Sequence, residues 1–167
     1  FIHFLALCNG YDYVFFDMGP SLGAINRSIL LACDYFITPM SSDVFSLLAL
    51  GNIGSSISSW SKLFNKGILE LDEDKKRSLD GMRQRCEIEF LGYVEQQYIM
   101  KYTGGTARAV RAYDEILKQI PEAIQKDVVN QINIGKDDEI DYKIGSIPNF
   151  YSLVPMSQTA HKPIFEL

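Results

Sequence analysis

The chain has 167 residues, of which 47% are hydrophobic and 22% are charged, and its formal net charge is −5. These values are ordinary for a globular domain and unlike those of disordered or collagen-like chains. No apolar run reaches the roughly 20 residues of a membrane-spanning helix, and the acidity argues against a protein that coats nucleic acid over its whole surface. The three isolated cysteines, Cys8, Cys33 and Cys86, argue against a zinc site or a disulfide framework and favour a reducing cytoplasm.

The length suits one domain with a sizeable core. Neither an internal repeat nor a linker divides the sequence, so residues 1–167 are predicted to form a single α/β domain. The apolar residues 1–7 are predicted to be the end of a helix, which Asn9 and Gly10 would stop because both tolerate the left-handed conformation at a helix C-terminus.

The next stretch carries the main chemical candidate. Val14–Phe16 is an unbroken apolar run, typical of a strand buried on both faces of a parallel sheet. Asp17 follows where that strand would end, in the crevice where α/β sheets bind ligands. A Walker B aspartate holds Mg²⁺ through water beside a nucleotide's phosphates from this position. The alternative is that Asp17 is a turn former or a helix cap before the Gly-Pro-Ser turn.

Helix and strand patterns then alternate. Helical spacing predicts a helix over 22–33, capped by Ser21, and residues 35–38 predict a short buried strand closed by Pro39. Residues 41–43, Ser-Ser-Asp, are a helix-start signal. The helix that follows is rich in glycine and serine over 51–59, which favours either tight packing on the sheet or a dimer surface.

The middle of the chain is polar and then apolar. The mixed-charge run 71–78 predicts a solvated loop or the exposed start of a helix that reaches Arg85. Arg83 and Arg85 are weak candidates for phosphate contacts. Residues 88–94 predict the next strand, and Gln96 and Gln97 follow at its carboxyl end, near the same crevice.

A glycine-containing loop is predicted over 101–106, with Thr106 capping a helix that runs to about Ile120. Such a loop can bind an anion, but no lysine follows its glycines and a plain loop is the preferred interpretation. Arg108 and Arg111 would lie in the first turns of that helix and oppose its dipole. This makes them candidates for contacts with DNA phosphates.

The end of the chain completes the predicted sheet. Pro121 begins a helix over 122–132, and residues 143–148 predict a final strand. Pro148 and Asn149 predict a rigid turn over 147–151, and the tail from 149 to 167 is predicted to be mostly irregular. The alternation of strands and helices predicts a mostly parallel sheet flanked by helices.

Residues 11–23 resemble the Walker B and switch II segment of the ParA/Soj/MinD partitioning ATPases, a group of deviant Walker A P-loop ATPases. That group has an apolar strand followed by Asp-x-Pro-Pro-Ser-Leu-Gly. Residues 17–23 here are Asp-Met-Gly-Pro-Ser-Leu-Gly, so Gly19 replaces the first proline. The resemblance continues at residues 32–40, similar to the group's next strand, and returns at 147–149 and 160–167, similar to its closing loop. It is weak over 55–87.

The resemblance implies a P-loop NTPase-like fold with Walker B and switch II at 14–23. It implies a protein that binds ATP and Mg²⁺, forms a homodimer, binds DNA non-specifically and acts with a ParB-like partner in plasmid or chromosome partitioning, away from the membrane. Asp17 would hold the metal through water, and Gly19 and Pro20 would belong to the phosphate-sensing switch. Gln97, Pro148 and Asn149 would lie near the nucleotide base.

The phosphate-binding loop of such a protein is missing from this sequence. Neither Gly-x-x-x-x-Gly-Lys-Ser/Thr nor Lys-Gly-Gly-x-Gly-Lys occurs in it, although the amides and lysine of that loop hold the β- and γ-phosphates. In the resembled group the loop precedes the Walker B strand. The chain is therefore expected to be the carboxyl-terminal half of such an ATPase, with little activity and no cofactor of its own.

Two other functions remain open. The main alternative is a non-catalytic α/β module that binds DNA or a protein partner. A receiver-like doubly wound protein is a weaker alternative, because it would need clustered acids at strand ends and Asp17 stands alone in its stretch.

Overall fold

The structure is a computed structural model that describes residues 10–19, 21–78, 85–98, 100–103, 106–109, 111–132 and 140–166. Its elements follow one another along the chain as α2 (Ala24–Ala32), β1 (Tyr35–Ser41), α3 (Val44–Leu69), α4 (Glu73–Ser78), β2 (Glu89–Tyr98), β3 (Met100–Thr103), β4 (Thr106–Ala109), α5 (Arg111–Leu117), α6 (Ile120–Ile124), the π-helical turn η1 (Gln125–Val129), α7 (Asn130–Ile132), β5 (Lys143–Pro148), α8 (Leu153–Ala160) and the 3₁₀ turn η2 (Ile164–Glu166). None of the helices in these ranges combines the length and apolar character that crossing a bilayer requires.

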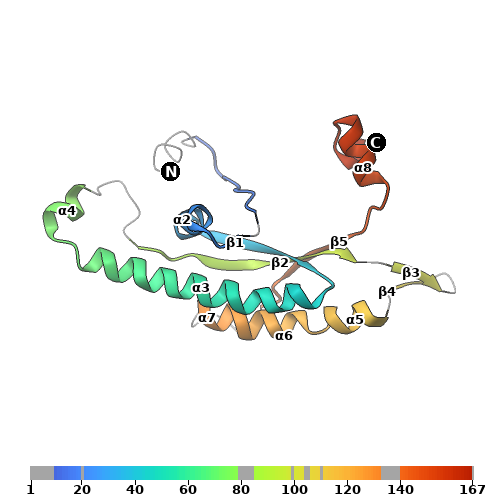
Figure 1. Cartoon of the computed structure of the whole chain (residues 1–167), viewed down its shortest axis with the longest axis horizontal. Coiled ribbons are helices and arrows are strands. Elements are labelled where there is room, and N and C mark those ends of the chain that lie inside the picture. Colours follow the sequence, from blue (N-terminus) through green and yellow to red (C-terminus); the bar gives the residue numbers. More distant parts are fainter. Residues whose placement is uncertain are drawn as a thin grey trace.

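The main sheet is parallel, with strand order β1-β2-β5. Figure 1 shows the long helix α3 and the segment from α5 to α7 on one side of this sheet. The predicted α/β architecture, with a parallel sheet flanked by helices, is thus confirmed. The strands β3 and β4 form a separate antiparallel hairpin at one end of the molecule.

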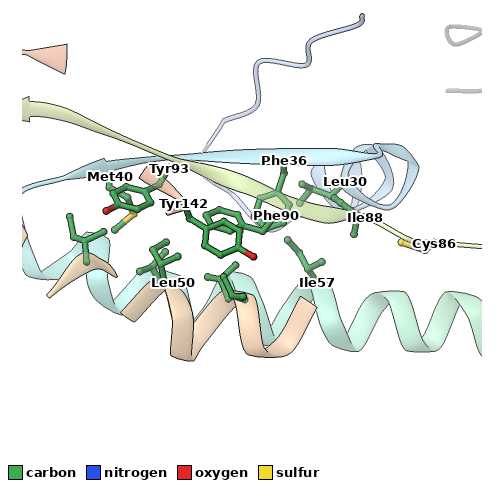
Figure 2. Close-up of a cluster of buried hydrophobic side chains, with 14 residues drawn as sticks. Leu30, Phe36, Met40, Leu50, Ile57, Cys86, Ile88, Phe90, Tyr93 and Tyr142 are labelled. Atoms are coloured by element: carbon green, nitrogen blue, oxygen red, sulfur yellow. The ribbon is translucent and has the colours of Figure 1, made fainter. Parts of the chain in front are cut away.

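The core lies between the sheet and these helices. Side chains alternate along β1, so that Phe36, Thr38 and Met40 are buried while their neighbours face outward. The ring of Phe90 on β2 packs 5.1 Å from the ring of Phe36 and 5.5 Å from that of Tyr142 (Figure 2). From the helices, the core receives Leu30, Leu50, Ile57, Ile120, Ile124 and Val128.

The helix α3 begins where the sequence predicted. Asp43 is its N-cap and accepts a hydrogen bond from the backbone N–H of Ser46 at 2.8 Å. The small residues of α3 have a structural role at Gly54, where an added Cβ would lie 1.8 Å from the carbonyl oxygen of Asp127 in η1. The close approach at Gly54 is therefore to the helical turn η1, and not to the sheet on which tight packing was predicted.

The other face of the sheet is open in the described residues. Large apolar side chains of β1 and β2 on this face are exposed: Tyr35, Ile37 and Leu91. Parallel sheets are normally covered on both faces. The α8 segment, which carries exposed Leu153, Val154 and Met156, stands on this side of the sheet without covering those residues (Figure 1).

Several predicted features differ from the structure. Residues 13–19 have no regular secondary structure, so the strand predicted at Val14–Phe16 is wrong, and Phe15 is 86% exposed. A strand needs a hydrogen-bonded neighbour, and none of the described strands pairs with this segment. Ser21 does not cap α2, whose N-cap is Gly23. The helical end predicted at 1–7 lies outside the described residues.

The other two differences follow from turn and proline chemistry. Thr106 begins strand β4 rather than a helix, since the Gly-Gly dipeptide between two short strands is typical of a two-residue hairpin connection. The tail is helical over Leu153–Ala160 and not mostly irregular. Pro155 is tolerated there because it lies in the first turn of α8, where its missing N–H costs no intrahelical hydrogen bond.

Candidate functional site

The candidate site is the edge of the sheet where the three parallel strands end. Ser41 of β1 lies beside Gln96 of β2, and Gln96 lies beside Ile147 of β5. Pro148, the last residue of β5, is paired with Tyr98, the last residue of β2. The carboxyl ends of a parallel α/β sheet are where ligands bind in such folds. The ends of β1, β2 and β5 thus lie at one edge, as predicted, but β1 runs past Pro39 to Ser41. Asp17, which was predicted to end a strand at the same edge, lies in a segment without regular secondary structure.

The connection from β1 to α3 contributes polar groups at this edge. The carboxylate of Asp43 accepts hydrogen bonds from the backbone N–H and the hydroxyl of Ser46, and the Ser46 hydroxyl accepts one from the backbone N–H of Ser41. Next to this closed cap, the hydroxyl of Ser42 is buried and has no hydrogen-bond partner among the described residues. A buried hydroxyl without a hydrogen-bond partner lowers the stability of the folded state. A polar group placed next to Ser42 would therefore be stabilising.

The predicted turn after β5 is formed. The side-chain oxygen of Asn149 accepts a hydrogen bond from the backbone N–H of Tyr151 at 2.8 Å, and Tyr151 has a positive φ of 46°. This is the local side-chain-to-backbone bond that asparagine makes in turns. Whether Pro148 and Asn149 contact a nucleotide base stays a prediction.

A polar cluster around the buried side chain of Glu95 lies beneath the same edge. The carboxylate of Glu95 on β2 accepts hydrogen bonds from the Lys143 ammonium at 2.7 Å and from the Ser146 hydroxyl at 2.8 Å, both on β5. Tyr93, two residues earlier, is buried, and this burial, together with the charges of Glu95 and Asp141, raises the pKa of Tyr93 to about 12. The phenol therefore stays protonated at neutral pH.

Asp17 lies outside the sheet, next to residues that are held in place by contacts with the core and with α2. Its side chain is exposed, while its neighbour Met18 packs against the hydrophobic core. The amide of Asn26 on α2 donates hydrogen bonds to the carbonyl oxygens of Gly19, at 2.9 Å, and Ser21, at 2.7 Å. The segment that follows Asp17 is thus tied to the first turn of α2.

The described residues by themselves do not form a metal centre. No group of three or more histidine, cysteine, aspartate or glutamate side chains gathers in them as a metal would require. Asp17 suits Mg²⁺ only in the role of one carboxylate that holds a hydrated ion, with phosphate oxygens supplying other ligands. Its exposure leaves it accessible for that role.

The remaining predicted site residues lie in several places. Gln97 is in β2, next to the carboxyl edge, and Arg108 is in β4. Arg111 begins α5, so the expected placement of Arg108 and Arg111 one turn apart on a single helix is wrong. Pro20 and Arg83 lie outside the described residues.

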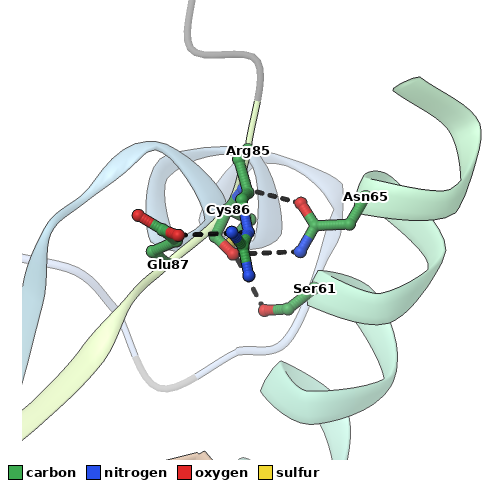
Figure 3. Close-up of polar contacts among 5 residues, drawn as sticks. All are labelled: Ser61, Asn65, Arg85, Cys86 and Glu87. Atoms are coloured by element: carbon green, nitrogen blue, oxygen red, sulfur yellow. Dashed lines mark hydrogen bonds and ion pairs between the residues drawn. The ribbon is translucent and has the colours of Figure 1, made fainter. Parts of the chain in front are cut away.

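Arg85 lies at the opposite end of β2 from the candidate site. Its guanidinium contacts Glu87, with Nε 3.0 Å from Oε1. Beside it, the side-chain amide of Asn65 holds the backbone of Cys86 by bonding both its N–H and its carbonyl oxygen, and the Cys86 thiol lies 3.3 Å from the Ser61 hydroxyl (Figure 3). These contacts fix the start of β2 against α3, a structural role.

Sequence reasoning did not single out Ser42 or Glu95. Glu95 was detectable in principle, because an acidic residue directly follows the apolar run of a buried strand. Ser42 gave no separate signal, since it lies within the Ser-Ser-Asp helix start and only the burial of its hydroxyl distinguishes it.

Comparison with known proteins shows which family and which solved structure the chain is similar to. Residues 3–69 match the model of the AAA domain family, and a search of curated proteins gave no match. The crystal structure of protein DIP2308 from Corynebacterium diphtheriae resembles the chain with a TM-score of 0.62 and 25% sequence identity. The similarity covers 95% of this chain and 51% of that protein, so the chain spans about half of its length. The chain thus has an α/β fold consistent with that of P-loop NTPases, and its residues 3–69 are similar to the AAA domain family.

Proposed function

We propose that this chain is the carboxyl-terminal half of a ParA-like, MgATP-binding ATPase that acts in plasmid or chromosome partitioning. The observation that carries the proposal is the match of residues 3–69 to the AAA domain family. The matched segment contains Asp17 with the Gly-Pro-Ser-Leu-Gly sequence after it, and the strand and helix start from Tyr35 to Asp43.

Each part of the candidate site has a role in this function. Asp17 would hold Mg²⁺ through water, and the ion, when bound, neutralises charge that develops on the phosphates. Gly19, whose carbonyl oxygen accepts a hydrogen bond from Asn26, and Pro20 would respond to the γ-phosphate. The turn at Pro148 and Asn149 would lie along the purine ring, with Gln97 at the neighbouring strand end.

Two open surfaces support the idea that further protein completes the domain. The strand β1 pairs with β2 on one side only, among the described strands. The segment before α2 has exposed Tyr13, Val14 and Phe15, an unusual arrangement for three consecutive large apolar residues. A phosphate-binding strand beside β1 would give this segment a sheet to join, and helices of the other half would cover the open sheet face.

The test uses a full-length protein that contains both this chain and a phosphate-binding loop. Asp17→Ala should abolish Mg²⁺-dependent ATP hydrolysis while changing the melting temperature little, since the side chain is exposed. Asp12→Ala is the matched control, because Asp12 is also an exposed acid in the same segment. Turnover that stays within a few-fold of wild type in the Asp17 variant would make Asp17 a turn residue only.

A DNA-binding role is the second function that a specific observation favours. In the hairpin of β3 and β4, Lys101 is paired with Arg108 across the strands, so two basic residues stand directly opposite each other in the ladder. A two-stranded ribbon fits the major groove of DNA. We propose non-specific DNA binding through this hairpin and Arg111, with homodimerisation and a ParB-like partner as the associated properties of the resembled group.

A further inference from the structure

Glu95 is a buried carboxylate that joins the edge strand β5 to the centre of the sheet. Its residue is 7% exposed. Both of its partners, the Lys143 ammonium and the Ser146 hydroxyl, come from β5, so one side chain of β2 holds two positions of the neighbouring strand. The Lys143 side chain is partly exposed, at 38%, which keeps one end of the ion pair near water.

The pairing of β5 with β2 is irregular. The register shifts between Tyr93 and Val94 and again between Gln96 and Tyr98. In addition, β5 is at the edge of the sheet, with β2 as its one neighbour among the described strands. Its apolar residues Ile144 and Ile147 are exposed, so burial does little to select one register over another.

An ion pair with one buried partner is well suited to select a register. Its net contribution to stability is small, because desolvation offsets the attraction between the charges, and a hydrophobic replacement is often as stable. Its geometric demand is strict, since a slip of one residue turns every side chain of the strand to the opposite face. In a slipped β5, neither the ammonium of Lys143 nor the hydroxyl of Ser146 would reach Glu95.

We propose that Glu95 is a positioning residue: it locks β5 in register and thereby holds the turn at Pro148 and Asn149 where it meets the base of a bound purine nucleotide. The turn starts two residues after Ser146, so any shift of β5 moves it along the sheet edge. This inference rests on the proposed function, because the nucleotide is the ligand that the turn would meet. Glu95 itself lies beneath the edge and acts through the strand.

The first test measures the register directly in the full-length protein. A Gln96→Cys, Ile147→Cys pair links neighbouring positions of β2 and β5, and a Ser41→Cys, Gln96→Cys pair links β1 and β2 as the control. Replacing Glu95 with Leu, which keeps an apolar fit, should slow formation of the first disulfide by about tenfold or more, since misplacements of about 1 Å can cost a hundredfold in such proximity reactions. The control disulfide should form at an unchanged rate.

The second test measures nucleotide use in the same protein. Glu95→Leu should raise KM for ATP by about tenfold, with kcat within a few-fold, because the turn contributes binding shared by the ground and transition states. The exchange Glu95→Lys with Lys143→Glu should restore the ion pair, the disulfide rate and KM together. A role in stability alone would change the melting temperature and leave KM unchanged.

The outcomes separate this inference from the proposed function. An unchanged rate for the Gln96 and Ile147 pair in Glu95→Leu overturns the register lock. A slowed disulfide with an unchanged KM overturns the link between the register and the nucleotide. If the wild-type full-length protein neither binds nor hydrolyses MgATP, the proposed function and the nucleotide part of the inference both fail, while the disulfide rates still decide whether Glu95 sets the register.

Discussion

Gly54 determines how closely α3 and the π-helical turn η1 approach each other. A Cβ at this position would lie 1.8 Å from the Asp127 carbonyl oxygen and 3.3 Å from the Cα of Val128. Both are backbone atoms, so a rotamer change cannot relieve the clash. Gly54→Ala should therefore lower the free energy of unfolding by about 1–3 kcal/mol or more, the usual cost of overpacking a core, and urea denaturation measures this directly.

Gly51 provides the matched control on the same helix. An added Cβ there meets no heavy atom within 4 Å, and alanine is a better helix former than glycine. Gly51→Ala should leave stability unchanged or raise it by about 0.5–1 kcal/mol. Equal effects of the two substitutions would contradict the proposed close contact between α3 and η1.

The raised pKa of Tyr93 predicts how the free energy of unfolding depends on pH in the alkaline range. Its pKa is about 12 in the folded chain, against an ordinary value of 10.0. Because folding raises the pKa, the folded state holds the phenol proton more tightly, and the stabilisation from this is complete below pH 10. It should be lost as pH rises from about 10 to about 12. Denaturation curves recorded across this range should show the free energy of unfolding falling.

The variant Tyr93→Phe isolates this contribution. It removes the phenol, so its stability should fall less steeply between pH 10 and pH 12 than that of wild type. Tyr13→Phe is the control, since Tyr13 is highly exposed and its loss should leave the slope unchanged. A wild-type slope in Tyr93→Phe would assign the alkaline dependence to other groups.

At the scale of elements, the hairpin of β3 and β4 gives a prediction about DNA. Each phosphate contact contributes roughly one unit to the slope of log K against log salt. Because Lys101 and Arg108 are paired across the two strands, Lys101→Glu with Arg108→Glu should weaken non-specific DNA binding at low salt and reduce the slope by about two. Fluorescence anisotropy with the full-length protein at several salt concentrations measures both values.

Two controls locate the surface within the chain. Arg85→Glu should leave DNA binding unchanged, since Arg85 is paired with Glu87 at the far end of β2. Arg111→Glu tests whether the start of α5 extends the hairpin surface. If the hairpin variant binds as wild type does while the Arg85 variant is weakened, the DNA surface lies at the start of β2.

The elements that sequence predicted correctly are those whose signals are local. The apolar residues 35–38 mark β1, although the strand is buried on one face only and runs past Pro39 to Ser41. The Ser-Ser-Asp sequence marks the start of α3, and Asn149 bonds its own backbone two residues later. The strand at Val14–Phe16 was wrong because a strand depends on a neighbour that local sequence does not supply. The hairpin was missed because a Gly-Gly dipeptide suits both a loop and a two-residue turn.

The candidate site was predicted less completely than the fold. Because the strands are parallel, the ends of β1, β2 and β5 meet at one edge as expected. The burial of the Ser42 hydroxyl and the bridge from Glu95 to Lys143 depend on contacts between residues far apart in sequence, up to 48 positions for the latter pair. Spacing and residue type carry no information about such contacts.

At the scale of the whole molecule, the sheet is well packed on one face and open on the other. The buried residues of the sheet face α3 and α6, whereas Ile37 of β1 and Leu91 of β2 on the opposite face are exposed. Contiguous apolar surface of this kind marks contact with other protein. About half of the length of the C. diphtheriae protein lies outside the region that resembles this chain.

The sequence also predicts how strongly the isolated chain binds and hydrolyses a nucleotide. The 167 residues contain no phosphate-binding loop and no lysine placed after one, and those groups supply most of the binding energy for the β- and γ-phosphates. The edge of β1, β2 and β5 can offer contacts to the base, and Asp17 can offer one carboxylate. We therefore expect the isolated chain to bind MgATP very weakly and to hydrolyse none, as titration calorimetry and a phosphate-release assay would measure. The full-length protein, measured in the same buffer, should bind at micromolar concentrations, whereas micromolar binding to the isolated chain would mean that its own residues form a complete nucleotide site.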